Sequence, residues 1–325
     1  MILHLYDKIF RELVELTANH YGYELSRVEK EYWICKILKE LALSPFSEKT
    51  FFKGGTSLSK GYGVIKRFSE DLDLFVYSGN PISSKQSEKT LNRYVSHFII
   101  ENNREMYVEK FSKTGGDFRK LAFSYNSHYE SSGLKENVEV EVKCCTVEDK
   151  STMFCPTQKR KIQSVITDYL QAMEKEEIIV RFGLVFFEVQ TIDPKRTLCD
   201  KISRLTKLSL GNDYEMLIAK HIRDVYDIHC ILMIPEYRFF IQSDHFRSAM
   251  KWVVDEDGLF RSMPLPYSVA NVHLFSEPEK TLKLPTIFRA YHSELKQLMF
   301  DANALPPLDE VIDSFVLLQK SLHQL

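Results

Sequence analysis

The chain has 325 residues, of which 44% are hydrophobic. This is enough for two domains of ordinary size with packed cores, and it argues against wholesale disorder. The 43 basic and 45 acidic residues leave a net charge of −2, which argues against a protein that coats nucleic acid by bulk charge. A polyanionic ligand would need a local basic patch instead.

The sequence also lacks the features of membrane and secreted proteins. It contains no run of about 18 apolar residues, and its start, MILHLYDKIFRELVEL, has neither the basic beginning nor the unbroken apolar stretch of a signal peptide. None of the six cysteines belongs to a CxxC pair. We therefore expect a reduced, cytoplasmic protein with no membrane span and no structural zinc.

Helical and strand patterns are mixed over the first 190 residues. Residues 2–18 have apolar side chains at helical spacing, and a second helix is predicted from Ser26, which has capping-box spacing to Glu29, up to about Pro45. A third helix is predicted within 88–110, after a polar loop at 79–88. Alternating apolar residues predict strands at 71–76, 121–125 and 138–142, with one or two more within 178–189.

After about residue 193 helical patterns dominate the sequence. They predict helices at 196–209, 213–233, 243–256, 286–302 and 308–323. We therefore expect an α+β N-terminal domain, residues 1–192, followed by an α-helical C-terminal domain, residues 193–325.

Asp71 and Asp73 are the strongest candidates for chemistry. Alternate residues of a strand point the same way, so the two carboxylates share a face about 7 Å apart, while Leu72 and Leu74 face the core. Carboxylates this close repel each other unless a cation neutralises them, and Mg²⁺ binds through one or two carboxylates plus substrate phosphates. The alternative is a solvated acidic pair at a strand edge.

A glycine turn precedes the acidic strand. Gly54 and Gly55, followed by Thr56 and Ser57, come after an apolar pair and before a predicted helix. Glycines let the backbone approach a phosphate closely, free N–H groups at a helix start favour anions, and the Ser57 hydroxyl can donate to a phosphate oxygen. Alone, this pattern is also that of an ordinary turn with a helix cap. Together with the acidic strand, it predicts a triphosphate beside a metal site.

The segment KGGTSLSKGYGVIKRFSEDLDLFV, residues 53–76, resembles the AbiEii/AbiGii-type nucleotidyltransferase toxins of the DNA polymerase β-like superfamily. It carries the family form Arg-x-Ser-x-Asp-x-Asp, although the interval from Gly55 to Asp71 is longer than in the wider superfamily. Three further segments are similar to the family: VEKEYWICKILKEL (28–41), PKRTLCDKISRLTKL (194–208) and HIRDVYDIHCIL (221–232). The resemblance implies a mixed-sheet nucleotidyltransferase domain and a helical domain that contributes to the site.

The resemblance also implies roles for individual residues. It assigns catalysis to Asp71, Asp73, Lys201 and Asp224. Nucleotide and phosphate contacts are assigned to Lys53, Gly54, Gly55, Thr56, Ser57 and Arg67. A third metal-binding carboxylate is expected at Glu139 or Glu141, which share a strand face, and we favour Glu141. In some relatives a serine or threonine placed like Ser69 is phosphorylated to silence the toxin.

The residues themselves leave some of these roles open. Lys201, Arg204 and Lys207 recur at helical spacing as a short basic stripe that can hold phosphates or simply face solvent. Asp224 lies in a half-buried helix, where it can be a structural ion-pair acid, an orienter of Lys201 or a catalytic group. Asp227, one turn further on, is expected to be structural.

The predicted activity is Mg²⁺- or Mn²⁺-dependent transfer of a nucleotide from an NTP to RNA, most plausibly the tRNA 3′ end, by a toxin that a cognate antitoxin neutralises. Two alternatives differ in class. One is a nucleotidyltransferase acting on a protein side chain or on a small molecule such as an antibiotic. The other is a non-catalytic nucleotide- or RNA-binding module, against which the intact glycines, acids and Lys201 argue.

Overall fold

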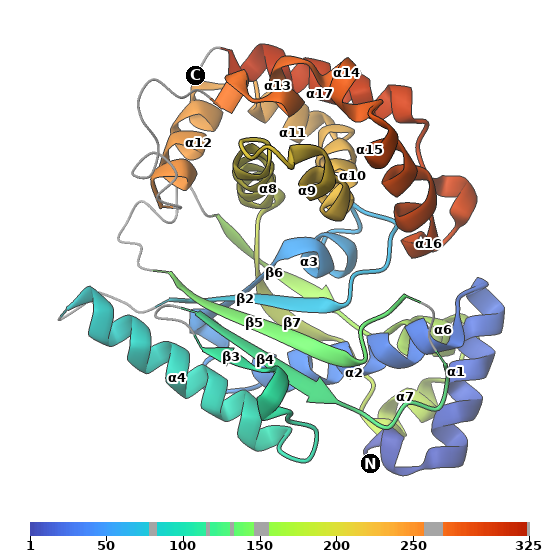
Figure 1. Cartoon of the computed structure of the whole chain (residues 1–325). Helices are drawn as coiled ribbons and strands as arrows, with labels where there is room; N and C mark the ends of the chain where they lie inside the picture. Colours follow the sequence, from blue (N-terminus) through green and yellow to red (C-terminus); the bar gives the residue numbers. More distant parts are fainter. Residues whose placement is uncertain (78–82, 115–117, 131–132, 146–155, 257–268, 324–325) are drawn as a thin grey trace. The chain divides into compact units, whose positions relative to one another are not determined.

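The computed structural model describes residues 1–77, 83–114, 118–130, 133–145, 156–256 and 269–323 (Figure 1). They form two compact units. The sheet unit comprises the described parts of Met1–Gly63, Phe68–Lys150 and Thr157–Ile192. The helical unit comprises Val64–Arg67, Pro156 and the described part of Asp193–Leu325. The α+β fold class followed by a helical region is confirmed.

A seven-stranded mixed sheet is the centre of the sheet unit, with the order β3-β4-β5-β2-β1-β7-β6. Strands β2 and β5 run parallel, as do β1 and β7, whereas the other neighbours are antiparallel. The strands are β1 (Thr50–Lys53), β2 (Asp71–Tyr77), β3 (Lys113–Thr114), β4 (Phe118–Ser124), β5 (Asn137–Cys145), β6 (Thr157–Ile162) and β7 (Phe187–Ile192).

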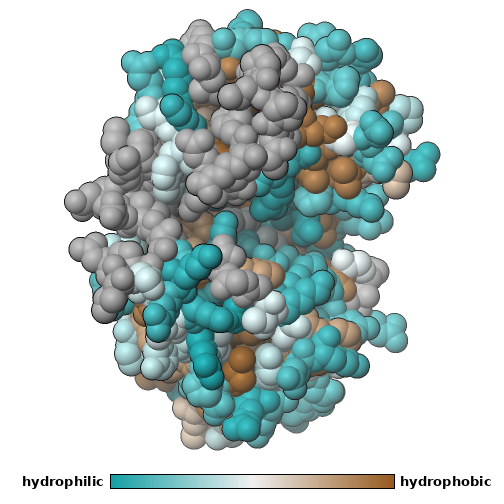
Figure 2. Space-filling view, turned by 60° about the vertical axis from the view of Figure 1, so that its left-hand side comes forward, coloured by the Kyte–Doolittle hydropathy of each residue, from teal (hydrophilic) through white to brown (hydrophobic). Residues whose placement is uncertain are grey.

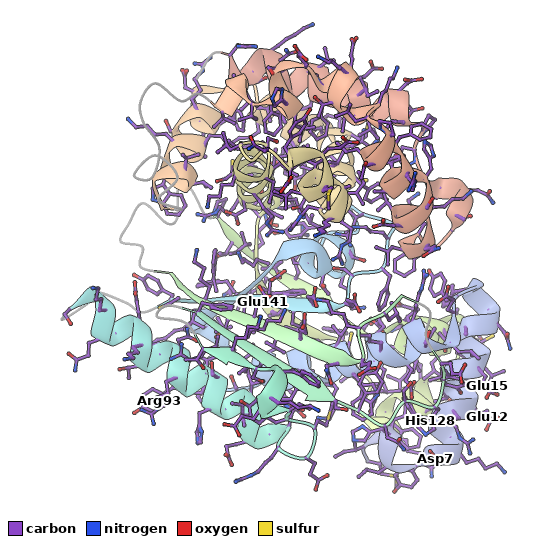
Figure 3. All side chains as sticks on the ribbon, in the orientation of Figure 1. Asp7, Glu12, Glu15, Arg93, His128 and Glu141 are labelled. Carbon is purple, nitrogen blue, oxygen red and sulfur yellow. The ribbon has the colours of Figure 1, made fainter. Side chains whose placement is uncertain are left out.

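The sheet has one apolar and one polar face at its centre. Leu72 and Leu74 of β2 and Val140 of β5 are fully or almost fully buried, as their alternation predicts. Helices α2 (Leu25–Ala42) and α4 (Ser84–Asn102) pack on β2 and β5, and Figure 1 shows both on one side of the sheet. In Figure 3, Glu141 lies on the opposite side of the sheet from Arg93 of α4. The face of β2 and β5 that carries Glu141, called the acidic face below, is therefore the one that α2 and α4 do not cover.

Helix α2 begins at Leu25 rather than at Ser26, and the predicted capping box is wrong. Ser26 lies inside the helix, and its N-cap residue Glu24 makes no side-chain cap hydrogen bond within the described chain. Glu29 instead turns away from the helix start and accepts hydrogen bonds from Ser127 and from the backbone N–H of His128. A fully buried carboxylate requires such partners, and this need outweighs local capping.

The one or two strands predicted within 178–189 correspond to one strand, β7, and the first half of that range is helical. Helix α7 (Glu176–Phe182) occupies this stretch and ends at Gly183, which adopts the left-handed conformation, before β7 begins. Its buried residues, Ile179 and Phe182, have helical spacing. Strand β6 was not predicted, because TQKRKI has a single buried residue and forms the sheet edge. The remaining helices of the sheet unit are α1 (Asp7–Tyr21), α3 (Gly54–Lys60) and α6 (Val165–Ala172).

The helical unit is built around α8 (Pro194–Leu208), α10 (Ile222–Leu232) and α17 (Leu308–Leu322), which pack in sequence on one another. The predicted helix 213–233 is interrupted at His221, and 286–302 contains a π-helical segment at Ala290–Leu295. The other helices are α9 (Tyr214–Lys220), α11 (Pro235–Phe240), α12 (Asp244–Glu256), α13 (His273–Ser276), α14 (Pro278–Leu282), α15 (Pro285–Arg289) and α16 (Lys296–Leu298).

The surface is mixed in character. On the face shown in Figure 2, hydrophobic side chains form small groups among hydrophilic ones. In the part of the chain that the structure describes, no helix is both long and apolar enough to cross a bilayer.

Candidate active site

The pairing of β2 with β5 brings four carboxylates onto one face of the sheet. The parallel register places Asp71 beside Glu139 and Asp73 beside Glu141. Side chains that are in register on neighbouring strands point the same way, so all four acids share the face opposite the buried leucines and valines. Both predicted candidates for a third carboxylate therefore belong to the acidic face, one beside each aspartate.

Two lysines neutralise part of this acidic face. The Lys135 ammonium lies 2.8 and 2.9 Å from the two carboxylate oxygens of Asp71 and also donates to Glu139. Lys120 of β4 reaches Glu139 at 2.8 Å and Glu141 at 3.4 Å. Glu139 is thus held by two lysines, whereas Glu141 has one distant partner and a side chain that is 42% exposed.

Burial and these lysines act in opposite directions on the acids. Burial raises the pKa of Asp71, and although Lys135 lowers it, the net pKa stays above the ordinary value. Burial also raises the pKa of Glu139, but hydrogen bonds from Lys120 and Lys135 outweigh it and hold the pKa below the ordinary value. Asp71 therefore depends more than Glu139 on a nearby cation to stay ionised.

Gly54 is required by its contact with Asp73. Its φ is +77°, in the left-handed region, and a Cβ placed on it would lie 2.8 Å from the Asp73 Cγ and closer still to a carboxylate oxygen. Register pairing of Lys53 with Asp73 brings the turn to this position. The Lys53 ammonium itself lies 3.9 Å from the centre of the Phe75 ring, a cation–π contact. The glycine turn and the acidic strand are therefore in direct contact.

The hydroxyls of the turn hold it together. Thr56 lies 3.0 Å from the Ser69 hydroxyl and donates to the backbone carbonyl of Asp71, and Ser57 donates to the carbonyl of Gly54 at 2.9 Å. Thr56 and Ser57 are both buried, whereas Ser69 is partly exposed and precedes β2. Contacts of Thr56, Ser57 and Gly55 with phosphate remain predictions.

The helical unit holds the other predicted site residues in one buried ion network. Asp193 caps α8 by accepting from the backbone N–H of Lys195, which fixes the start of the helix that carries Lys201. The Lys201 ammonium lies 2.5 Å from Asp224 and 2.8 Å from Asp227. Lys201 is 5% exposed, so this end of the basic stripe does not face solvent.

Arg67 completes this network from the segment Val64–Arg67. Its guanidinium donates to both carboxylate oxygens of Asp227, at 2.7 and 2.6 Å, and it is buried. Arg204, which is half-exposed, reaches Asp224 at 3.2 Å. Asp227 thus has the contacts of a structural acid, and the phosphate contact of Arg67 remains a prediction.

The network strongly stabilises the ionised form of its acids. Burial opposes ionisation of Asp224, but Lys201 and Arg204 outweigh it and lower its pKa to about 2. The pKa of Asp227 is lowered in the same way, with Arg67 as the largest favourable contribution against burial.

The acidic face suits a hard divalent cation. Among the described residues, no three histidine, cysteine, aspartate or glutamate side chains gather as metal ligands. Mg²⁺, however, commonly takes only one or two protein carboxylates and completes its shell with water and phosphate oxygens. The Lys135 ammonium lies between oxygens of Asp71 and Glu139 and occupies the place of a bound cation, held by carboxylate oxygens. The donor set therefore fits such a metal.

The sequence analysis missed the residues that organise the acidic face, Lys30, Glu70, Lys120 and Lys135. Glu70 adjoins Asp71, and the alternation of 118–124 extends the predicted strand 121–125 to Lys120, which could have pointed to those two. The partner of Lys30 lies 40 residues away in the chain. Lys135 is four residues from Glu139, but its contact with Asp71 spans 64 residues, so no local pattern predicts that it bridges the two acids.

The chain matches a known protein family over most of its length. The family model described as "Nucleotidyl transferase AbiEii toxin, Type IV TA system" matches residues 36–314. Among solved structures, the nucleotidyltransferase toxin MenT4 from Mycobacterium tuberculosis is similar with 14% sequence identity and a TM-score of 0.46, over 94% of this chain and 89% of that one. No curated protein matches the sequence.

Replacing Gly54 tests the contact between the turn and the acidic strand. Gly63→Ala is the matched control, since its φ is +64° but a Cβ there would meet nothing within 4 Å. We expect Gly63→Ala to lower the free energy of unfolding by about 1 kcal/mol, and Gly54→Ala by about 1–3 kcal/mol more because it also displaces Asp73. Trp33 fluorescence in a Trp252→Phe background, during urea unfolding, measures both. Equal losses would show that Asp73 does not pack on Gly54.

The pKa of Asp224 predicts a pH-dependent stability. Because that pKa is about 2 in the folded chain against an ordinary 3.8, its stabilisation is fully present above about pH 4 and is lost as the pH falls toward 2. At pH 7, Asp224→Asn should lower the free energy of unfolding by about 3 kcal/mol, and the difference from wild type should shrink below pH 4. Asp213→Asn, at an exposed position, should change it by less than about 0.5 kcal/mol.

The measurement is urea unfolding followed by Trp252 fluorescence in a Trp33→Phe background, because α12 carries Trp252 within the helical unit. A gap between wild type and Asp224→Asn that stays constant from pH 7 to pH 3 would contradict the depressed pKa.

Proposed function

The chain belongs to the AbiEii family of nucleotidyl transferase toxins of type IV toxin–antitoxin systems, and from this premise we propose that it transfers a nucleoside monophosphate from an NTP to RNA. The observation that carries the proposal is the contact between the Gly54 turn and Asp73, on the same face as Asp71. A turn that can approach phosphate and acids that can hold a cation are the two parts that nucleotidyl transfer requires.

The proposed reaction is an in-line displacement at the α-phosphorus. A hydroxyl oxygen of the acceptor forms a bond to that phosphorus while the bond to the pyrophosphate oxygen breaks, and pyrophosphate leaves. Asp71 and Asp73 would hold Mg²⁺ or Mn²⁺, which supplies neutralisation of the phosphate charge. We propose that Glu141 accepts the proton of the attacking hydroxyl. It pairs with Asp73 in the strand register and is more exposed and less tightly bound by lysines than Glu139.

We propose that further residues position the triphosphate. We retain Lys201 as the cation for the outer phosphates and assign to Asp224 the role of orienting it, because the two are 2.5 Å apart in a buried pair. Lys201 lies on α8 and Asp224 on α10, and these two helices pack on each other, so the pair is held rigidly. The remaining proposed nucleotide contacts are those at Lys53, Gly54, Gly55, Thr56, Ser57 and Arg67.

The proposed acceptor is RNA, and more narrowly the 3′ end of tRNA. The proposed place of the reaction is the cytoplasm. Membership of a type IV toxin–antitoxin family supports an antitoxin as the cognate partner. Acceptors of another class, a protein side chain or a small molecule, would use the same acids and are separated from RNA by the assay below.

Labelled nucleotides test the activity and the acceptor together. The purified chain is incubated with each of the four labelled NTPs and with tRNA, total RNA, protein or candidate small molecules, with Mg²⁺ or with EDTA. We expect label on tRNA in Mg²⁺ and none in EDTA. Asp71→Ala should lower the rate at least about a hundredfold and abolish toxicity in cells, because it leaves Asp73 as the one carboxylate of β2 that can hold the cation.

Asp168→Ala is the control, since this acid lies exposed on α6 of the same unit and should leave the rate unchanged. Glu139→Gln and Glu141→Gln in the same assay identify the third carboxylate. Label on protein or on a small molecule alone would replace the RNA acceptor. A fully active and fully toxic Asp71→Ala chain would overturn the proposed site.

Ser69 is the proposed regulatory residue. It is partly exposed, contacts Thr56 of the glycine turn at 3.0 Å and lies two residues before Asp71. A phosphate on it would add negative charge beside the acidic face and break the contact with the turn, so we expect phosphorylation to stop nucleotide transfer. Mass spectrometry after co-expression with the antitoxin tests this. Complete neutralisation with unmodified Ser69 would exclude this route.

A further inference from the structure

Lys135 occupies the place between two acids of the proposed metal site. Its ammonium bridges Asp71 of β2 and Glu139 of β5, on the face that carries all four carboxylates. We propose that Lys135 is a built-in counter-ion, which neutralises Asp71 and Glu139 when no metal is bound and gives up Asp71 when a divalent cation binds. This inference rests on the proposed function, because it concerns the regulation of the same site.

The electrostatics of the acidic face require such a cation. Neighbouring strands lie about 4.8 Å apart, and two carboxylates at that distance repel each other unless a cation lies between them. Lys135 lies close to both carboxylate oxygens of Asp71, at 2.8 and 2.9 Å, and also donates to Glu139. A lysine can satisfy the charge but offers three hydrogen-bond donors and no vacant coordination position for a phosphate.

The backbone of Lys135 is held firmly, and only its side chain is free to leave. Its N–H donates to Glu70 at 2.8 Å, and its carbonyl accepts from the Lys30 ammonium. Lys30 and Glu70 form a buried ion pair at 2.7 Å, in which the Lys30 side chain is 0% exposed. The Lys135 side chain, by contrast, is 38% exposed. A fixed backbone with a half-exposed side chain lets the ammonium swing away without local unfolding.

Glu29, which precedes Lys30 in α2, holds the segment between β4 and β5 at a second point, His128. The ring of His128 lies 2.7 Å from Glu29 and 2.6 Å from Asp7 of α1, as Figure 3 shows for Asp7 and His128. Glu29 and Lys30, consecutive in α2, therefore anchor His128 and Lys135. Lys30 therefore helps to place the counter-ion, directly through the Lys135 carbonyl and indirectly through Glu70.

Lys135 and a divalent cation therefore compete for Asp71, and this competition sets the metal affinity. A divalent cation must break the contacts of Lys135 with Asp71, so free metal binds more weakly than the acids alone would allow. Mg²⁺ that arrives with a triphosphate brings further contacts and outcompetes the lysine. Removing the Lys135 charge should therefore tighten binding of free metal while leaving the acids in place.

Mn²⁺ binding to the full-length chain, without nucleotide, measures this directly by electron paramagnetic resonance. Lys135→Met keeps the length of the side chain, and Lys135→Gln serves if that variant does not fold. The matched control is Lys143→Met, which removes the same charge from β5 but, among the described residues, has no ion pair with Asp71 or Glu139. We expect Lys135→Met to bind Mn²⁺ about tenfold more tightly than wild type, and Lys143→Met within about twofold.

Thermal unfolding supplies a second readout. In EDTA, Lys135→Met should have a lower Tm than wild type because the acids repel, and saturating Mg²⁺ should restore it. Unchanged or weaker Mn²⁺ binding by Lys135→Met, beside measurable binding by wild type, would overturn the role of Lys135 while leaving the proposed function intact. If no form of the chain binds Mn²⁺, with or without an NTP, the metal site fails and this inference fails with it.

Discussion

The repulsion among carboxylates on adjacent parallel strands is the constraint on which the sheet unit depends. The register of β2 and β5 places Asp71 beside Glu139 and Asp73 beside Glu141 on the face that α2 and α4 leave uncovered. Such a face is costly unless cations lie on it. Lys120 and Lys135 meet that need within the chain, and the buried Lys30–Glu70 pair holds the backbone from which Lys135 reaches the acids.

The helical unit solves a similar problem in the opposite way. Asp224 and Asp227 are buried and therefore surrounded by three cations, of which Arg67 comes from a segment 160 residues earlier in the chain. Here the cations lower the pKa of both acids below the ordinary value, so the acids are ionised at neutral pH. In the sheet unit the two lysines are partly exposed, and we propose that the acids there are the groups that bind a ligand. This difference in burial separates a fixed ion network from one that can admit a ligand.

Local patterns were sufficient for some elements and failed for others for identifiable reasons. Leu72 and Leu74 alternate with the aspartates, so period two predicted both the core face and the acidic face of β2. Period two did not predict β6, because its polar side chains suit a sheet edge. In the apolar stretch 178–189, Gly183 ends helix α7, so the strand begins only after it. The capping box at Ser26 failed because Glu29 is needed elsewhere, by His128.

The sequence by itself determined the class of fold, the two aspartates that share a face, the glycine turn beside them and the family to which the chain is similar. Each of these depends on residues within about one element, where periodicity and motif spacing act. Only the tertiary structure decided which glutamates join Asp71 and Asp73, that Arg67 is bound to Asp227, and that Lys135 bridges the acids. The contact of Lys135 with Asp71 joins residues 64 positions apart and that of Arg67 with Asp227 residues 160 apart, so no local pattern predicts them. Strand order, which sets the pairing of the acids, is governed by burial of the whole sheet.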